Sequence, residues 1–137
     1  MNVPVLVLMG FAGWTLLTLL GSVGVYRWSH ILTRRTSIAE WRADVPQGSE
    51  WYQRAMRAHL NCVENLPLLT ALVVAIVASD VKSALIDAFA IALLAARIGQ
   101  TIVHIALPPT NSAATVRFFL FAVQVACMIA VGVTILR

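Results

Sequence analysis

Three polar side chains share one face of a helix that is otherwise apolar enough to cross a membrane. Arg57, Asn61 and Glu64 are spaced at i, i+4 and i+7, which puts them within roughly 60° of one another on an α-helix. Residues 54–67, which hold them, run without a break into the apolar residues 68–79. Ionisable groups inside a membrane-spanning segment are costly and by default indicate a functional site. The alternative is a structural pair in which Arg57 and Glu64 lock this helix to a neighbour.

A second polar face follows in the next apolar segment, where Arg97, Thr101 and His104 repeat the same spacing. A short polar turn makes the two helices antiparallel neighbours, so the end of one lies level with the start of the other. The last apolar segment carries Arg117 in its first turns, at the same level. The intramembrane charges therefore converge at one side of a helical bundle, except for Asp87 at the opposite end.

Composition indicates the class of protein. Of the 137 residues, 60% are apolar and 12% are charged, which is typical of an integral membrane protein. At about 20 residues per spanning helix, the chain has room for four helices and little else. The formal net charge of +4 lies mostly in one loop, which indicates membrane topology and not binding of nucleic acid. Cys62 and Cys127 lack metal-ligand spacing, so we expect no metal site.

We therefore expect an all-α fold, an integral membrane four-helix bundle that forms a single domain over residues 1–137. The predicted helices cover residues 3–26, 54–79, 83–107 and 113–136, and residues 27–53 form the one sizeable extramembrane loop. Because that loop is rich in arginine, the positive-inside rule places it in the cytoplasm, with both termini on the outer side. The polar site then opens toward the cytoplasm.

The converging side chains suit an anionic ligand. Arg57, Arg97 and Arg117 supply guanidinium groups, which bind carboxylate or phosphate through paired hydrogen bonds. Glu64 is the obvious carboxylate of the set and could receive an ammonium group. A ligand with two carboxylates and one amine, such as the small peptide glutathione, fits these groups. A phosphorylated lipid headgroup also fits the guanidinium groups, and sequence geometry does not separate the two ligands.

The segment RAMRAHLNCVENLPLL resembles the second-helix signature of the MAPEG family, membrane-associated proteins in eicosanoid and glutathione metabolism. The residues that carry the resemblance are Arg57, Ala58, His59, Asn61, Glu64 and Pro67, supported by Arg97 and Arg117. The resemblance implies a homotrimer of four-helix protomers, with glutathione bound as co-substrate between adjacent subunits near the cytoplasmic side.

The resemblance also implies roles for particular residues. Arg57, Asn61 and Glu64 would contact glutathione. Arg97 would line the same pocket, and Arg117 would be the catalytic arginine that activates the thiol. A free thiol with a pKa of about 8.5 is only a few per cent thiolate at neutral pH, and a nearby cation lowers that pKa. The thiolate would then attack an electrophilic carbon on a hydrophobic substrate that enters from the lipid bilayer.

Three positions depart from the better-known eicosanoid enzymes of the family. His104 stands where those enzymes have a tyrosine. Phe118 follows the arginine of the fourth helix, where the prostaglandin synthase has a serine, and Asn65 stands where the leukotriene synthase has a tyrosine. These departures argue against a dedicated eicosanoid enzyme and leave a general glutathione transferase or peroxidase. His104 itself either lines the glutathione site or hydrogen-bonds across helices as a neutral side chain, and His59 is expected at a packing contact.

Two other classes of function remain open at this point. A membrane protein with the same fold could bind lipid or another ligand without catalysis. A small transporter or channel subunit could use the intramembrane charges as a relay, although these charges cluster at one end and do not cross the membrane. Binding of glutathione separates the enzyme from both alternatives.

Overall fold

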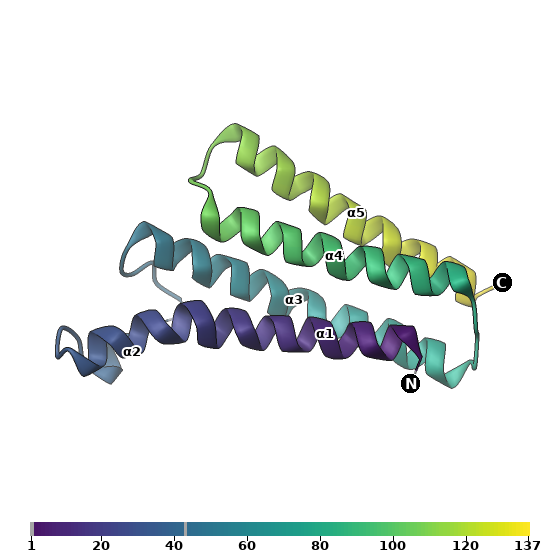
Figure 1. Cartoon of the computed structure of the whole chain (residues 1–137), viewed down its shortest axis with the longest axis horizontal. Helices are drawn as coiled ribbons and strands as arrows, with labels where there is room; N and C mark the ends of the chain where they lie inside the picture. The colour runs from purple at the N-terminus through teal and green to yellow at the C-terminus, as the bar shows by residue number, and fades with distance from the viewer. Residues whose placement is uncertain (1, 43) are drawn as a thin grey trace.

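The computed structural model describes residues 2–42 and 44–137, and this part of the chain is helical without any strand. Figure 1 shows the long helices side by side in one bundle, with both termini at the same end. The elements are α1 (Val3–Thr18), the π-helical turn η1 (Leu19–Gly24), α2 (Val25–Leu32), the short 3-10 turn η2 (Ile38–Glu40), α3 (Glu50–Ala78), α4 (Ala84–Ala106) and α5 (Asn111–Ile135). Four continuous helical segments, called rods below, are long and apolar enough to cross a membrane. They are Val3–Leu32, which joins α1, η1 and α2, and the helices α3, α4 and α5. The predicted all-α membrane bundle is confirmed.

The first rod is longer than the hydropathy pattern predicts. It continues through η1 and α2 to Leu32 instead of ending near residue 26. The next rod also begins earlier than predicted, at Glu50, because the Ser49 side chain accepts a hydrogen bond from the Tyr52 backbone N–H and caps the helix there. The connection between them is therefore residues 33–49, shorter than the expected loop over residues 27–53. Hydropathy reports where the chain leaves the apolar layer, whereas a helix ends where its backbone hydrogen bonds end.

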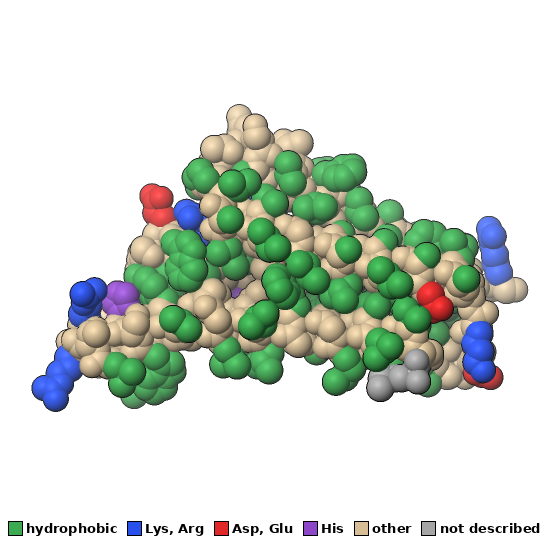
Figure 2. Space-filling view, viewed as in Figure 1, with side chains coloured by type: hydrophobic (Ala, Val, Ile, Leu, Met, Phe, Trp, Pro, Cys, Tyr) green, Lys and Arg blue, Asp and Glu red, His purple; other side chains and the backbone are tan. Residues whose placement is uncertain are grey.

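The core lies along the line where the helices meet. Its central cluster contains apolar side chains from every long rod: Phe11, Cys62, Leu69, Val73, Leu93 and Cys127. Both cysteines are buried and free, and they pack as small apolar side chains. The most extensive contact between two helices is that of α4 with α5, and α1 packs on both α3 and α4. Figure 2 shows hydrophobic side chains over much of the visible face, with Lys or Arg side chains at both ends and a His side chain at one of them.

Aromatic rings hold the connection at residues 33–49 against the ends of α2 and α3. Tyr26 stacks on Tyr52 with 4.5 Å between ring centroids, and Trp41 meets both rings edge-on. The Arg27 Nε donates to the Tyr52 hydroxyl at 2.6 Å. This cluster fixes the extramembrane connection at the end of the bundle where the predicted polar site lies.

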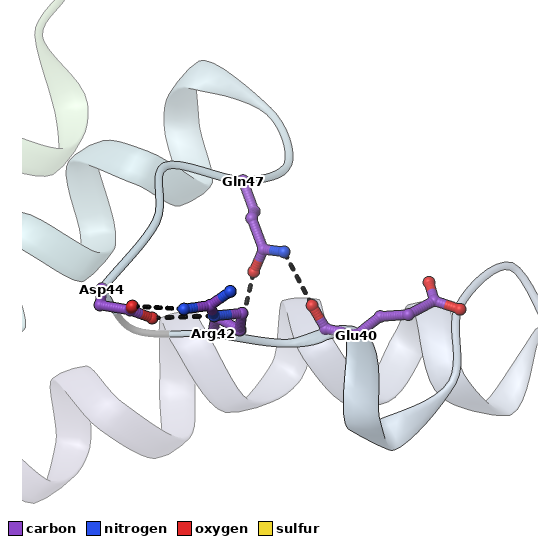
Figure 3. A network of polar contacts seen from close by, with 4 residues as sticks. All are labelled: Glu40, Arg42, Asp44 and Gln47. Atoms are coloured by element: carbon purple, nitrogen blue, oxygen red, sulfur yellow. Dashed lines mark hydrogen bonds and ion pairs between the residues drawn. The ribbon is translucent and has the colours of Figure 1, made fainter.

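Polar side chains within the same connection also bond to one another and to its backbone (Figure 3). The Gln47 side chain accepts from the Arg42 backbone N–H and donates to the Glu40 carbonyl, each at 2.7 Å. Arg42 also forms a bidentate ion pair with Asp44. The segment is thus held by backbone-directed bonds as well as by the rings.

Gly48 provides a test of this arrangement. Its φ of +72° is in the left-handed region, and an added Cβ would lie 3.0 Å from atoms of Tyr26 and Tyr52. We expect Gly48→Ala to lower the stability of the detergent-solubilised protein by about 1–2 kcal/mol, because it adds backbone strain and displaces the rings. Thermal unfolding followed by circular dichroism measures the change.

The matched control is Gly132→Ala in α5, where an added Cβ meets nothing within 4 Å. That change should leave stability unchanged or raise it by about 0.5–1 kcal/mol, because alanine favours a helix interior. Equal effects of the two substitutions would contradict the role given to Gly48.

Candidate functional site

An open-sided cavity of about 360 Å³ lies between α3, α4 and α5. Its lining combines polar and apolar side chains: Asn61, Gln100, His104, Ala114, Arg117, Phe118 and Phe121. Three of the residues that the sequence singles out, Asn61, His104 and Arg117, are therefore brought together. Each comes from a different helix.

The connections between the helices explain why these three side chains lie at one cavity. The turn between α3 and α4 makes these helices antiparallel, so the first half of α3 lies level with the end of α4 (Figure 1). The Thr110 side chain then caps α5 by accepting from the Ala113 backbone N–H, which starts α5 directly beyond the end of α4. Arg117 consequently returns to the level of His104. Gln100 and His104 are one turn apart on α4 and face the same cavity.

The loop-facing rim of the cavity is strongly cationic. Arg117 borders the cavity beside His104, and Arg54 and Arg57 lie within electrostatic range of the His104 imidazole. Arg54 reaches across to α4, where its Nε donates to the Ile105 carbonyl at 3.1 Å. Arg57 is exposed and lines a neighbouring cleft of about 170 Å³ beneath the extramembrane connection. These groups form one positively charged region that a carboxylate or phosphate would neutralise.

Glu64 lies on the exposed side of α3 and is not among the residues that line the cavity. Among the described residues, the ion pairs are Arg42 with Asp44 and Lys82 with Asp80, so Glu64 and Arg57 do not form one within the protomer. A carboxylate in the middle of a membrane-spanning helix is unfavourable unless it meets a partner. Among the described residues of this chain, Glu64 has no such cationic partner.

Arg97 is the residue whose place differs most from the expectation. The resemblance implies that it lines the glutathione pocket, but its side chain is 1% exposed and lies in the core. Its guanidinium carbon is 5.5 Å from the centre of the Phe11 ring on α1, which is a cation–π distance. Arg97 and His104 share a stripe of α4, yet they are two helical turns apart. At the depth of Arg97 that stripe is covered by α1, whereas at His104 it borders the cavity.

Two amides adjoining the site were not selected from the sequence. Asn65 is buried and donates from Nδ2 to both the backbone carbonyl and the Oδ1 of Asn61, at 2.7 and 3.2 Å. The Asn61 oxygen thus accepts a hydrogen bond within α3, and the side chain also lines the cavity. Gln100 borders the cavity beside Arg117 and donates to its backbone carbonyl at 3.1 Å. The i, i+4 spacing of Asn61 and Asn65 could have predicted their contact from the sequence. No local spacing predicts the contact of Gln100 with Arg117, because these residues lie on different helices.

His59 lies away from the cavity, as expected for a packing residue. Its Nδ1 is 3.4 Å from the Thr18 hydroxyl on α1. It therefore belongs to the contact between α1 and α3.

Comparison with known proteins gives one match. The model of the MAPEG family matches residues 4–137 of this chain, which is nearly its whole length. No curated protein and no solved structure matches at a comparable level of significance.

The different surroundings of the arginines predict different chemical reactivity. In the folded, detergent-solubilised protein, phenylglyoxal should modify Arg57, which is exposed, and Arg117, which is partly exposed, but not Arg97, which is buried. Mass spectrometry of the digested protein measures each rate. Arg35, exposed in the extramembrane connection, is the reference for a freely accessible arginine. If Arg97 reacted as fast as Arg117 before unfolding, its core position would be wrong.

Proposed function

The chain belongs to the MAPEG family, and from that membership we propose that it is an integral-membrane, glutathione-dependent transferase or peroxidase that acts on hydrophobic electrophiles. The observation that carries the proposal is the shared cavity of Asn61, His104 and Arg117. Two further cations lie close to it: Arg54 bonds to the Ile105 carbonyl, and Arg57 lines the neighbouring cleft. Glutathione has two carboxylates, one ammonium group and a thiol, and each of these finds a suitable partner here.

Binding would use the groups around the rim. Arg57 and the amide N–H groups of Asn61 donate to the carboxylates, and the Glu64 carboxylate receives the ammonium group. His104 lines the same cavity and contacts the bound peptide. Arg97 has no direct part in binding, because the core encloses it; it supports the helices that carry the site.

Arg117 is the proposed catalytic residue. A guanidinium beside the thiol favours the thiolate, and each unit by which the thiol pKa falls corresponds to about 1.4 kcal/mol of that preference. In conjugation, the sulfur forms a bond to an electrophilic carbon and displaces the leaving group. In reduction of a hydroperoxide, the sulfur takes the terminal oxygen and the alcohol leaves; a second glutathione then yields glutathione disulfide and water.

The hydrophobic substrate would approach through the aromatic side of the cavity. Phe118 and Phe121 border it beside Arg117, and Phe118 is 71% exposed on the apolar outer surface. A substrate dissolved in the bilayer can therefore reach the thiolate without crossing the cationic rim.

The proposed assembly is a homotrimer with glutathione between adjacent subunits. It supplies the covering group that the Glu64 side of α3 lacks within one protomer. The proposed orientation places the arginine-rich connection and residues 107–110 in the cytoplasm, with both termini on the outer side, by the positive-inside rule. The site then opens toward the compartment where glutathione is abundant.

A ligand-binding protein without turnover is the second candidate. It is favoured by the aromatic residue that follows Arg117, since Phe118 cannot donate a hydrogen bond to a reacting group. The two candidates share the cavity and differ in whether it binds glutathione as a thiolate.

The thiolate of bound glutathione gives the first test. We expect saturable ultraviolet absorbance of the thiolate when glutathione is titrated into the detergent-solubilised protein at neutral pH. Arg117→Ala should remove that absorbance and lower turnover with an electrophilic aromatic halide by at least about a hundredfold, the loss typical of one electrostatic group in an active site.

The matched control is Arg35→Ala, which removes an exposed arginine from the extramembrane connection and should leave both signals unchanged. Binding without thiolate in the wild type would favour the ligand-binding protein. Unchanged turnover in Arg117→Ala would exclude its catalytic role.

The ammonium partner gives a second test. Glu64→Gln should weaken binding of glutathione about tenfold, because one charge-assisted hydrogen bond is lost. It should hardly affect binding of N-acetylglutathione, which has no ammonium group. Calorimetric titration measures both ligands, and native mass spectrometry should show a species of three chains for the wild type and the variant. Equal weakening for both ligands would contradict the pairing, and a monomer in native spectra would contradict the shared site.

A further inference from the structure

Two buried glutamines connect α5 to α4 at the level of Arg117. Gln124 on α5 is 0% exposed, and its Nε2 donates to the Gln100 Oε1 on α4 at 3.0 Å. Gln100 in turn donates from Nε2 to the Arg117 backbone carbonyl at 3.1 Å. Among the residues that the structure describes, these are the side-chain hydrogen bonds that join α4 and α5. The connection ends on the backbone of the proposed catalytic residue.

Backbone carbonyls determine the direction of this chain of hydrogen bonds, because a carbonyl can only accept. Gln124 Nε2 also donates to the Leu120 carbonyl at 2.9 Å, so the Gln124 amide is anchored with its nitrogen toward Gln100. If the Gln100 amide were reversed, its oxygen would face the Arg117 carbonyl and its nitrogen would face the nitrogen of Gln124. Gln124 therefore holds Gln100 in the orientation that donates to Arg117.

This arrangement leaves one polar atom without a partner. The Gln124 Oε1 is buried and accepts no hydrogen bond from any described residue. An unpaired acceptor away from water is unfavourable, above all inside a membrane protein. An unbranched apolar side chain of similar length, such as methionine, would fill this position without that loss. The glutamine thus needs an explanation other than packing.

We propose that Gln124 is a positioning residue for Arg117 and acts through Gln100. The inference rests on the proposed function, in which the Arg117 guanidinium stabilises the glutathione thiolate. Arg117 lies in the second turn of α5, which begins at Asn111, directly after the turn whose first four backbone N–H groups have no partner within the helix. The bond from Gln100 fixes that turn relative to α4, which also carries His104.

The consequence for the reaction is specific. The interaction between a guanidinium and a thiolate weakens as the two charges move apart. Several other groups share the binding of the glutathione carboxylates, so a displaced Arg117 should affect ionisation of the thiol more than affinity for the peptide.

The test uses the full chain in detergent, with Gln124→Met as the variant. We expect the midpoint of the pH titration of bound thiolate to rise by about one unit, with about tenfold less thiolate and turnover at pH values below both midpoints. The KM for glutathione should stay within about twofold, because the groups that bind its carboxylates are unchanged. The control is Thr134→Val, which removes a hydroxyl on α5 that bonds only to the Ala130 carbonyl of its own helix, and it should change none of these quantities.

A double variant tests whether Gln124 acts through Gln100. Adding Gln124→Met to Gln100→Met should raise the titration midpoint no further, because the connection is already broken. Additive shifts would overturn the proposed route. An unchanged midpoint in Gln124→Met would also overturn it, even if turnover fell together with the melting temperature.

Amide hydrogen exchange of residues 111–121 without glutathione separates this inference from the proposed function. Exchange should be faster in Gln124→Met than in the wild type and unchanged in Thr134→Val. A wild type that forms no thiolate would overturn the proposed function. Unchanged exchange in Gln124→Met would overturn the positioning role itself.

Discussion

Polar groups inside a membrane protein must find partners within the protein, because the bilayer core supplies none. Four helical rods meet this requirement for the backbone, and hydroxyl groups such as that of Thr15 meet it by bonding to a carbonyl one turn back. Side-chain amides must form hydrogen bonds with other side chains and with backbone carbonyls. Their pairings, Asn65 with Asn61 and Gln124 with Gln100, occur beside the cavity, so the same constraint that stabilises the bundle also orients the groups that face a ligand.

Packing places two arginines, which look alike in the sequence, in opposite surroundings. Arg97 and Arg117 are both isolated cations in apolar helices, yet Arg97 is enclosed against Phe11 while Arg117 borders an open cavity. The Arg97 Nε and Nη2 are buried without hydrogen-bond partners among the described residues, so the aromatic face is the main compensation for its charge. A guanidinium enclosed in this way does not line the cavity. One held beside a cavity, close to other cations, attracts an anion.

The extramembrane connection completes the cationic end of the bundle. The described residues of this connection are held by Trp41 against the rings of Tyr26 and Tyr52 and by the bonds of Gln47. Residues 44–47 line the same cleft as Arg57. These contacts could not be predicted from composition, which indicates only a basic loop with aromatic residues at the membrane interface. The left-handed backbone at Gly48 and the close approach of Tyr26 and Tyr52 to it depend on contacts between segments far apart in the chain.

The sequence by itself determined the class of protein, the four membrane-spanning segments, the family and the end of the bundle at which Asn61, His104 and Arg117 meet. Each of these follows from local hydropathy, from helical spacing or from the antiparallel order of short connections. Only the tertiary structure decided that Arg97 leaves the site for the core, that Glu64 lies outside the cavity, and that Gln124 reaches Arg117 through Gln100. Spacing along a helix assigns a side chain to a face, but the neighbouring helix at that depth decides whether the face meets a ring, a ligand or another amide.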